Sequence, residues 1–218
     1  MFKTLQPLIL ASLSPRRKRL LRSVGIEFRI EPSEVEESGA DGASAASATP
    51  AEAAQRWACL KARSVSASSP GSWVLGADTI VVLDGRVFGK PADRAEAARM
   101  LEALGGRVHE VITGICLTNG ENKFLRSGSV ATRVCFKPLT GAEIGSYIDT
   151  GEPMDKAGAY GIQGIGAFLV KSVEGSYTNV VGLPLCETVE WLTEAGIIEP
   201  ANPAKMTSFE VRGPRSDC

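Results

Sequence analysis

The run WVLGADTIVVLDGRVFGKP, residues 73–91, is the feature that most constrains the fold of this chain. Its apolar first part predicts a central strand over residues 73–83, in which Asp78 is the one charged side chain. The Asp-Gly pair that follows is a strong two-residue hairpin signal, so the chain should return as an antiparallel strand. A carboxylate buried without a partner costs several kcal/mol, so Asp78 must meet a metal ion, a cation or a cleft at a strand end.

A strand-turn-helix unit is predicted near the N-terminus. The apolar run PLILAS, residues 7–12, is typical of a buried strand, and Ser14 and Pro15 then suit the N-cap and first position of a helix. Free backbone N–H groups and the helix dipole favour an anion at such a start. Arg16 and Arg17 stand at the same place, so the unit is a candidate phosphate site.

Capping signals and hairpin turns divide the rest of the chain into elements. Helices are expected after Thr49, Asp93 and Thr140 and over residues 185–195. Strands are expected over residues 108–117, 129–139 and 167–173, the first two joined through an Asn-Gly turn. This mixture predicts an α/β fold with a mixed, partly antiparallel sheet flanked by helices. Residues 1–198 are expected to form one domain, and residues 199–218 a disordered tail.

The helix after Thr49 has an apolar stripe that includes Ala53, Trp57 and Leu60, which we expect to face the core. Lys61 borders this stripe, so its ammonium group could point outward to water or lean over a cleft.

Composition excludes several classes of protein. The chain has 218 residues, 44% of them hydrophobic and 22% charged, and its net charge of −1 argues against a surface that follows nucleic acid or anionic lipid. Its five cysteines form no CxxC pair, which suggests reduced cytosolic thiols and neither a zinc site nor a disulfide framework. No apolar run approaches the length of about 20 residues that a membrane span needs. We therefore expect a soluble, cytoplasmic protein.

The first 26 residues have an alternative interpretation, because they contain six basic residues and no acidic one. Such a composition is typical of a transit peptide, and PRRKR could be a localisation or nucleic-acid patch. The strand-turn-helix unit described above accounts for the same residues more specifically.

Two sets of polar side chains suit one task. Cations and hydroxyls bind phosphates, whereas carboxylates hold Mg²⁺ and can activate a water molecule for attack on phosphorus. The first set is Ser14, Arg16, Arg17, Lys61, Lys90 and Lys156, and the second is Glu34, Glu36, Glu37, Asp78 and Asp155.

Each of these residues also has an ordinary structural interpretation. PRRKR could be a solvated helix face, the glutamates a solvated turn, and the lysines surface residues. His109 lies among strand residues without a nearby serine or cysteine nucleophile pattern, so we expect a hydrogen-bonded structural histidine.

The stretch GEPMDKAGAYGIQG, residues 151–164, combines four glycines with fixed polar groups and suggests a binding loop. Its GIQGIG run is not a dinucleotide fingerprint, because an expected strand follows it instead of a helix.

Five motifs in order resemble the Maf proteins, which are nucleoside triphosphate pyrophosphatases similar in fold to the inosine triphosphatase superfamily. They are LASLSPRRKRLL, LGADTIVVLDGRVFGKP, GRVHEVITG, GEPMDKAGAYGIQG and VVGLPL, and the resemblance runs from about Leu8 to about Gly196. It implies a bilobed domain with a central cleft. The implied reaction is hydrolysis between the α and β phosphates, which gives the monophosphate and pyrophosphate with the help of a divalent metal, Mg²⁺ or Mn²⁺. A cytoplasmic homodimer with a role in cleaning the nucleotide pool is also implied.

The resemblance implies roles for individual residues. Asp78 matches the aspartate assigned as the general base, and Glu37 lies where the family has an acidic residue near the metal, so that both are candidate metal ligands. The candidate phosphate ligands are Ser14, Arg16, Arg17, Lys61 and Lys90.

Base recognition is implied by the loop, because DKAGAYGIQG resembles the subset that acts on dTTP and UTP and not the subset that acts on 7-methyl-GTP. A glutamine amide offers both a donor and an acceptor to the O4 and N3–H groups of uracil, so Gln163 is the expected reader of the base. Arg16 and Thr79 are the other positions linked to specificity.

Two alternatives remain at this point. One is a regulatory protein associated with septum formation that binds nucleic acid or a protein partner. The other is an enzyme that removes purine or modified-purine triphosphates.

Overall fold

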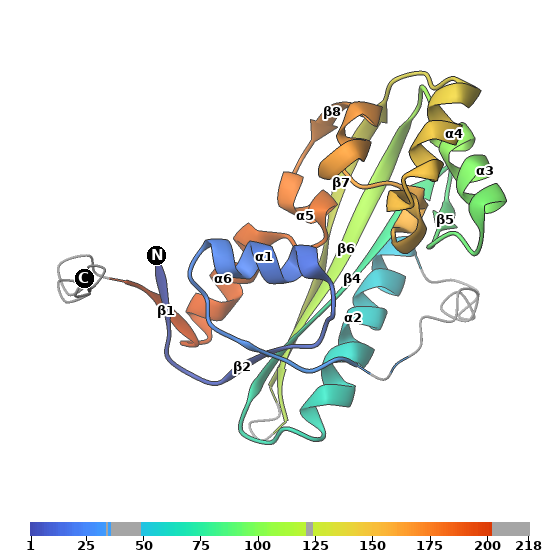
Figure 1. Ribbon diagram of the computed structural model, residues 1–218. Helices are drawn as coiled ribbons and strands as arrows, with labels where there is room; N and C mark the ends of the chain where they lie inside the picture. The colour runs from blue at the N-terminus through green and yellow to red at the C-terminus, as the bar shows by residue number, and fades with distance from the viewer. Residues whose placement is uncertain (34, 36–48, 121–123, 202–218) are drawn as a thin grey trace, which may run out of the picture.

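The computed structural model describes residues 1–33, 35, 49–120 and 124–201 (Figure 1). Its strands are β1 (Phe2–Thr4), β2 (Leu8–Leu10), β3 (Arg29–Ile30), β4 (Trp73–Leu83), β5 (Arg86–Phe88), β6 (Val108–Asn119), β7 (Phe124–Phe136), β8 (Val170–Glu174) and β9 (Ile198–Pro200). Its α-helices are α1 (Pro15–Ser23), α2 (Pro50–Ser66), α3 (Arg94–Leu104), α4 (Gly141–Asp149), α5 (Tyr177–Val181) and α6 (Leu185–Glu194). Short 3₁₀ segments η2 (Glu152–Asp155), η3 (Ala157–Ala159) and η4 (Gly164–Leu169) lie between α4 and β8. Within these ranges no helix is long and apolar enough to cross a membrane.

The main sheet is mixed, as the sequence predicted. Its strand order is β3-β2-β4-β6-β7-β8, with β5 paired to β4. β2 is parallel to β3 and β4, whereas β4, β5, β6, β7 and β8 pair antiparallel. A separate antiparallel pair joins β1 to β9, so Glu199 and Pro200, which the sequence placed in the tail, are strand residues. The rest of that expected tail, residues 202–218, lies outside the described residues.

One edge of β4 changes partner along its length. β4 pairs with β2 over Trp73–Leu75 and with β5 over Val81–Leu83. In the described part of the chain no strand pairs with residues 76–80 at this edge, and Asp78 lies in the middle of that gap. On its other edge β4 continues to pair with β6, where Asp78 lies opposite Gly114. The gap therefore leaves the backbone of a central strand without a strand partner next to a carboxylate, although Asp78 itself is buried.

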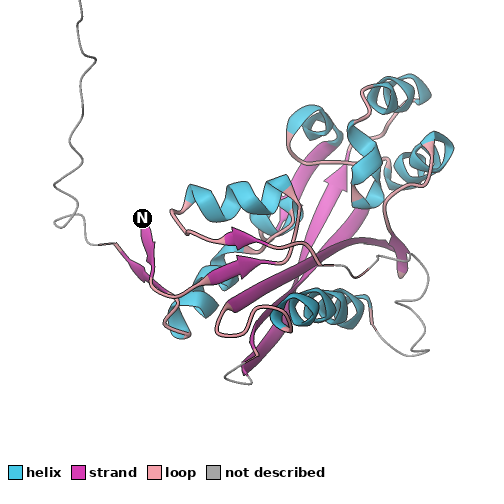
Figure 2. Ribbon diagram, turned by 60° about the horizontal axis from the view of Figure 1, so that its bottom comes forward, coloured by secondary structure: helices cyan, strands magenta, loops and turns pink. Residues whose placement is uncertain are grey.

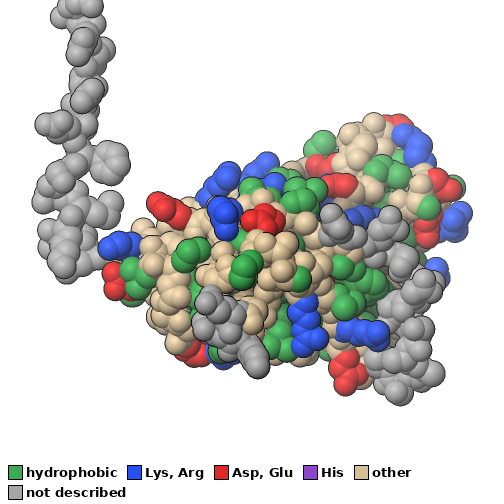
Figure 3. All heavy atoms as spheres, turned by 90° about the horizontal axis from the view of Figure 1, so that it is seen from below, with side chains coloured by type: hydrophobic (Ala, Val, Ile, Leu, Met, Phe, Trp, Pro, Cys, Tyr) green, Lys and Arg blue, Asp and Glu red, His purple; other side chains and the backbone are tan. Residues whose placement is uncertain are grey.

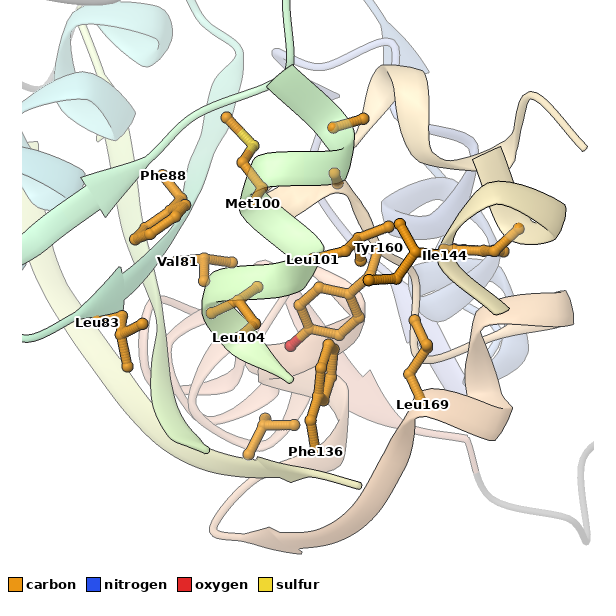
Figure 4. Packing of buried hydrophobic residues seen from close by; sticks show 14 of the residues in the cluster. Val81, Leu83, Phe88, Met100, Leu101, Leu104, Phe136, Ile144, Tyr160 and Leu169 are labelled. Carbon is orange, nitrogen blue, oxygen red and sulfur yellow. The ribbon is translucent and has the colours of Figure 1, made fainter. Parts of the chain in front are cut away.

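Helices cover both faces of the sheet (Figure 2). α2 packs on one face, where Ile9, Val74 and Cys116 form an apolar cluster with its alanines. The opposite face carries two larger clusters. One lies beneath α1 and α6 and contains Leu10, Leu21, Leu75, Leu117 and Leu192. The other lies beneath α3 and α4 and contains Val81, Leu101, Leu104, Phe136 and Tyr160 (Figure 4).

The prediction that Ala53, Trp57 and Leu60 of α2 face the core is wrong. Leu60 is 39% exposed, and Ala53 and Trp57 are only half-buried. The row that faces the sheet is made of smaller side chains together with one lysine: Ala54, Ala58, Lys61, Ala62, Val65 and Ser66.

Two glycines of the sheet explain why small residues face it. A Cβ on Gly76 would meet the carbonyl oxygen of Ala58, and a Cβ on Gly114 would meet that of Ala54, both well inside the 3.0 Å that real Cβ atoms respect. The α2 backbone therefore lies directly on the strands, and no large side chain fits between them. Hydrophobicity alone selected the wrong face because it ignores this close approach.

The strand expected over residues 167–173 begins later, since residues 164–169 form η4 and β8 starts at Val170. Gly164 has φ +79°, and the Glu152 carboxylate accepts the N–H groups of Ile165 and Gly166. These contacts hold the segment in a turn and remove donors that a strand ladder would use. Helix α5 was not predicted, although Ser176 caps it by accepting the N–H of Asn179.

His109 is structural, as expected. It is 2% exposed, its Nε2 lies 2.8 Å from the Tyr160 hydroxyl, and it packs edge-on against Phe136. Burial lowers the pKa of His109 to about 4.

This pKa predicts a loss of stability in mild acid. Between the ordinary histidine pKa of 6.5 and about 4, the unfolded chain binds a proton that the folded chain does not bind. Stability should therefore fall as pH falls through this window, by up to about 1.4 kcal/mol per pH unit from this group. Because the chain has a single histidine, an NMR titration reads its pKa directly and urea unfolding at each pH reads stability. A midpoint near 6.5 would contradict the burial argument.

Candidate active site

Asp78 and Lys61 form a buried ion pair at the gap in the sheet edge. The Lys61 Nζ lies 2.6 Å from Asp78 Oδ1, and the two side chains are only 7% and 10% exposed. The partner that Asp78 was predicted to need is thus a cation from α2. Lys61 is no ordinary surface lysine, because its ammonium group points inward from the helix face that lies on β4.

The start of α1 forms as predicted, with Ser14 at the N-cap and Pro15 in the first turn. The Ser14 hydroxyl accepts the N–H of Arg17 at 3.5 Å, and the Ser14 N–H donates to Ser12 Oγ at 3.3 Å. Arg16 is 26% exposed, with its guanidinium 3.7 Å from the carboxylate of Asp155. The helix start therefore presents a partly exposed cation at the positive end of the helix dipole, although the N–H groups of Ser14, Arg17 and Lys18 are already bonded.

Arg17 connects elements that are distant in sequence. Its Nε donates to the carbonyl of Gly182 at 2.7 Å, and its two terminal nitrogens donate to Ser12 Oγ and Thr79 Oγ1, both at 3.0 Å. The guanidinium thus fastens α1 to β4 and to the turn after α5.

A line of buried polar groups continues from Thr79 across the sheet. Thr79 and Thr113 share a hydrogen bond of 2.9 Å, and Thr113 Oγ1 donates to the carbonyl of Asn179 at 3.1 Å. Asn179 is fully buried, and its amide nitrogen donates to the carbonyl of Val111 and to Thr132 Oγ1, both at 2.9 Å. Sequence reasoning missed Thr113 and Asn179. A signal for both was available, because each is a polar residue within a largely apolar run, and such a residue needs a hydrogen-bond partner when it is buried.

The loop of residues 151–164 lies beside the β4–β5 hairpin. The N–H of Gly158 donates to the carbonyl of Gly89 at 3.0 Å, and a Cβ on Gly158 would meet the Val81 side chain at 3.0 Å. Lys90 follows Gly89 directly and is exposed. The loop is thereby fixed to the strand end that carries this lysine.

Gln163 is half-buried and precedes the first residue of η4. Among the described residues we find no hydrogen bond to its side-chain amide. Nearby, Asp155 accepts a 2.6 Å hydrogen bond from Lys156 and faces Arg16. Burial raises the pKa of Asp155, but the Lys156 hydrogen bond and the charges of Lys156 and Arg16 outweigh it and leave that pKa below its ordinary value.

The structure brings some predicted site residues together and leaves others apart. Lys61 meets Asp78, Arg17 meets Thr79, and Arg16 meets the loop that carries Gln163. Glu37, together with Glu34 and Glu36, lies outside the described residues. Within the described ranges, no cluster of three or more His, Cys, Asp or Glu side chains could hold a metal ion. The individual catalytic, phosphate, base and metal roles stay predictions.

Comparison with known proteins places the chain among related sequences. A family model described as Maf-like protein matches residues 7–195. A dTTP/UTP pyrophosphatase of Symbiobacterium thermophilum is 54% identical over 192 residues, covering 88% of this chain and 95% of that protein. One of Geobacter sulfurreducens is 50% identical over 191 residues, covering 88% and 97%. Among solved structures, the Ham1 protein of Staphylococcus aureus has a TM-score of 0.41 and 16% identity, covering 71% of this chain and 85% of that one.

Proposed function

Because the chain belongs to the Maf family, we propose that it is a nucleoside triphosphate pyrophosphatase that converts dTTP and UTP, ordinary or modified, to the monophosphate and pyrophosphate. Relatives at about half identity over nearly their whole length carry the name dTTP/UTP pyrophosphatase. The structural observation that carries the proposal is the Lys61–Asp78 ion pair in the gap of the β4 edge. Removal of triphosphates from the nucleotide pool is the corresponding role.

Asp78 is the proposed catalytic residue. Its carboxylate is held by a lysine at 2.6 Å, and its backbone lies where no strand of the described chain pairs with this edge of β4. A fixed carboxylate there can take a proton from a water molecule that attacks phosphorus. Positioning of that kind is the main contribution that proteins make to phosphoryl-type transfer.

The candidate phosphate ligands belong to elements at both ends of the gap. Ser14 and Arg16 stand at the start of α1, which follows β2, whereas Lys90 follows β5. β2 and β5 are the strands that border the gap. We propose that Ser14, Arg16, Arg17, Lys61 and Lys90 bind the triphosphate from these sides, with the dipole of α1 favouring the negative charge.

A divalent metal is proposed as cofactor, and the donors fit Mg²⁺ or Mn²⁺. The described residues supply Asp78 but no cluster of three or more metal-binding side chains. Mg²⁺ commonly takes one or two carboxylates together with substrate phosphates and water, so Asp78 and Glu37 would suffice as protein ligands. Such an ion would neutralise charge on the phosphates.

Substrate profiling tests the proposal. Pyrophosphate release should be measured with UTP, dTTP, CTP, GTP, ATP and 7-methyl-GTP, each with Mg²⁺, with Mn²⁺ and after chelation. Release from UTP and dTTP that requires the metal is the expected result. Turnover of purine triphosphates alone, or of no nucleotide by a folded protein, would overturn it.

Gln163→Glu tests the proposed reader of the base. The substitution replaces the amide donor by an oxygen, so the O4 acceptor of uracil loses its partner, at a cost of about 1 to 3 kcal/mol. We expect kcat/KM for UTP to fall by about tenfold or more, with an unchanged melting profile. Unchanged UTP kinetics in a folded variant would exclude Gln163 as the reader.

Other assignments rest on the family resemblance. We infer a homodimer in the cytoplasm, and light scattering on the purified protein tests its mass in solution. The alternative of a septum-associated regulatory protein receives no support from the names of the relatives. Basic and acidic side chains are interspersed over the face shown in Figure 3, unlike a continuous basic footprint for nucleic acid.

A further inference from the structure

We propose that Glu152 and Tyr147 are positioning residues that set base selectivity by holding the loop of residues 161–166 around Gln163. The inference rests on the proposed function, because it concerns how that site distinguishes bases. The site predicted from the sequence included neither residue.

The Glu152 carboxylate accepts most of the hydrogen bonds that hold this loop. Its Oε1 accepts the N–H of Gly166 and the hydroxyl of Tyr147, both at 2.9 Å, and its Oε2 accepts the N–H of Ile165 at 3.0 Å. The two N–H donors lie 13 and 14 residues away along the chain, so the carboxylate closes the segment between them and itself. Gln163 lies inside the closed segment, two residues before Ile165.

Tyr147 holds the other side of the loop. Its side chain belongs to the buried cluster beneath α3 and α4 and is 1% exposed, so its ring cannot move freely. While its hydroxyl donates to Glu152, it also accepts the N–H of Gly161 at 3.2 Å. Gly161 and Gly166, on either side of Gln163, are therefore held by two side chains, Tyr147 and Glu152, that are hydrogen-bonded to each other.

The loop fits so closely around these groups that two of its positions, Gly164 and Gly166, leave no room for a Cβ. Gly164 has φ +79°, and a Cβ there would lie 2.8 Å from Glu152 Oε2. A Cβ on Gly166 would meet the Tyr147 hydroxyl oxygen well inside the 3.0 Å limit of real contacts. Glu152 and Tyr147 thus contribute to the need for glycine at 164 and 166, together with the positive φ of Gly164 and the Gly161 carbonyl beside Gly166.

Selectivity needs such a frame because a glutamine amide is ambivalent. Uracil offers an acceptor at O4 and a donor at N3, whereas cytosine offers a donor at N4 and an acceptor at N3. Rotation of the amide by 180° exchanges its own donor and acceptor, so Gln163 on a loose loop could match either base. Discrimination therefore depends on where the loop holds the amide against the rest of the site, and Glu152 and Tyr147 fix the backbone that sets this position.

The test is the ratio of kcat/KM for UTP to kcat/KM for CTP in wild type, Glu152→Gln, Tyr147→Phe, Gln163→Ala and the double variant Glu152→Gln/Gln163→Ala. Glu152→Gln keeps the size of the side chain but replaces one acceptor oxygen by a donor that faces N–H or O–H groups. We expect it and Tyr147→Phe each to lower the ratio by about tenfold. In the Gln163→Ala background, Glu152→Gln should lower the ratio no further.

Glu143→Gln is the matched control. Glu143 lies on the same helix as Tyr147 and also accepts several hydrogen bonds, from Lys137 and from the N–H and hydroxyl of Thr140, but none of these bonds ties it to the loop. The substitution should lower the melting temperature and leave the ratio unchanged. A merely stabilising role of Glu152 would give the same pattern.

The outcomes separate the two proposals. If Gln163→Ala lowers the ratio while Glu152→Gln and Tyr147→Phe do not, the inference is wrong and the proposed function stands. An equal effect of Glu152→Gln with and without Gln163 would also overturn it. If wild type hydrolyses neither UTP nor dTTP, or Gln163→Ala leaves the ratio unchanged, the error lies in the proposed function or its base reader. Tyr147→Phe decides the inference if Glu152→Gln does not fold.

Discussion

Asp78→Asn is expected to lower kcat for UTP by about 10²- to 10⁴-fold while the chain remains folded. The substitution keeps the shape of the side chain but removes the charge, so the amide cannot accept the proton of the attacking water and would hold a divalent cation more weakly than a carboxylate does. The new amide would still offer a carbonyl oxygen to the Lys61 Nζ that lies 2.6 Å from the present carboxylate, which offsets part of the cost of burying that ammonium group without its anion. Initial rates of pyrophosphate release, with circular dichroism on the same samples, measure both effects.

The partner of Asp78 allows its catalytic and structural contributions to be separated. Lys61→Met leaves a carboxylate buried without its cation, and we expect a loss of about 3 to 5 kcal/mol in the free energy of unfolding. The double variant Asp78→Asn/Lys61→Met removes both charges and should recover much of that stability. It should recover none of the activity, because the carboxylate is still missing.

Asp84→Asn is the control for Asp78→Asn. Asp84 lies six residues after Asp78, in the exposed hairpin turn, where it pairs with Arg107. Loss of an exposed ion pair changes stability by no more than about 1 kcal/mol, and activity should stay at the wild-type level. An Asp78→Asn variant as active as Asp84→Asn would show that the chemistry takes place elsewhere.

Local signals predicted the elements well because each of them acts over a few residues. The capping boxes at Thr49 and Thr140 are both present, the Asp84-Gly85 turn joins β4 to β5, and Asp93 accepts the N–H of Glu96 at the start of α3. Hydrogen bonds between residues three or four apart need no knowledge of the tertiary fold. The need of Asp78 for a partner was likewise predictable from the cost of burial.

Long-range contacts were not predictable in the same way. Arg17 reaches Gly182 across 165 positions and Thr79 across 62, and nothing in the spacing of these residues indicates that they meet. Glu152 gave no signal either, because a glutamate in a loop is ordinarily a solvated side chain. Arg17 and Glu152 each form hydrogen bonds with groups from separate segments of the chain, and these segments lie close together only in the folded protein.

The face of α2 shows how the two kinds of information combine. Trp57 and Leu60 are more hydrophobic than Ala54 and Ala58, so a ranking by hydrophobicity selects the wrong side of the helix. The glycines of the strands carried the missing information. Gly76 lies two residues before Asp78 on the same strand and Gly114 lies opposite Asp78, and both set how closely the helix that carries Lys61 approaches.

Gly114→Ala is therefore expected to destabilise the protein by about 3 kcal/mol and to lower activity at the same time. A β-strand residue accepts alanine readily, and the φ of Gly114 lies outside the positive range, so the backbone conformation is no obstacle. The obstacle is the α2 backbone, because the new Cβ would overlap the carbonyl group of Ala54. Overpacking against atoms that cannot rotate away belongs at the upper end of its usual cost of about 1 to 3 kcal/mol. Urea unfolding and pyrophosphate release measure the two effects.

Two further variants distinguish this steric account from a general sensitivity to substitution. A Cβ on Gly145 in α4 would meet nothing within 4 Å, so Gly145→Ala should stabilise the protein by about 0.5 to 1 kcal/mol. Ala54→Gly should not rescue Gly114→Ala, because the overlap is with the backbone of Ala54 and trimming its side chain leaves that backbone in place. A Gly114→Ala protein with the wild-type unfolding midpoint would mean that α2 can lift from the sheet without cost. Such a movement would also pull the Lys61 ammonium group away from the Asp78 carboxylate. Because these two buried charges lie only 2.6 Å apart, we expect their separation to carry a cost.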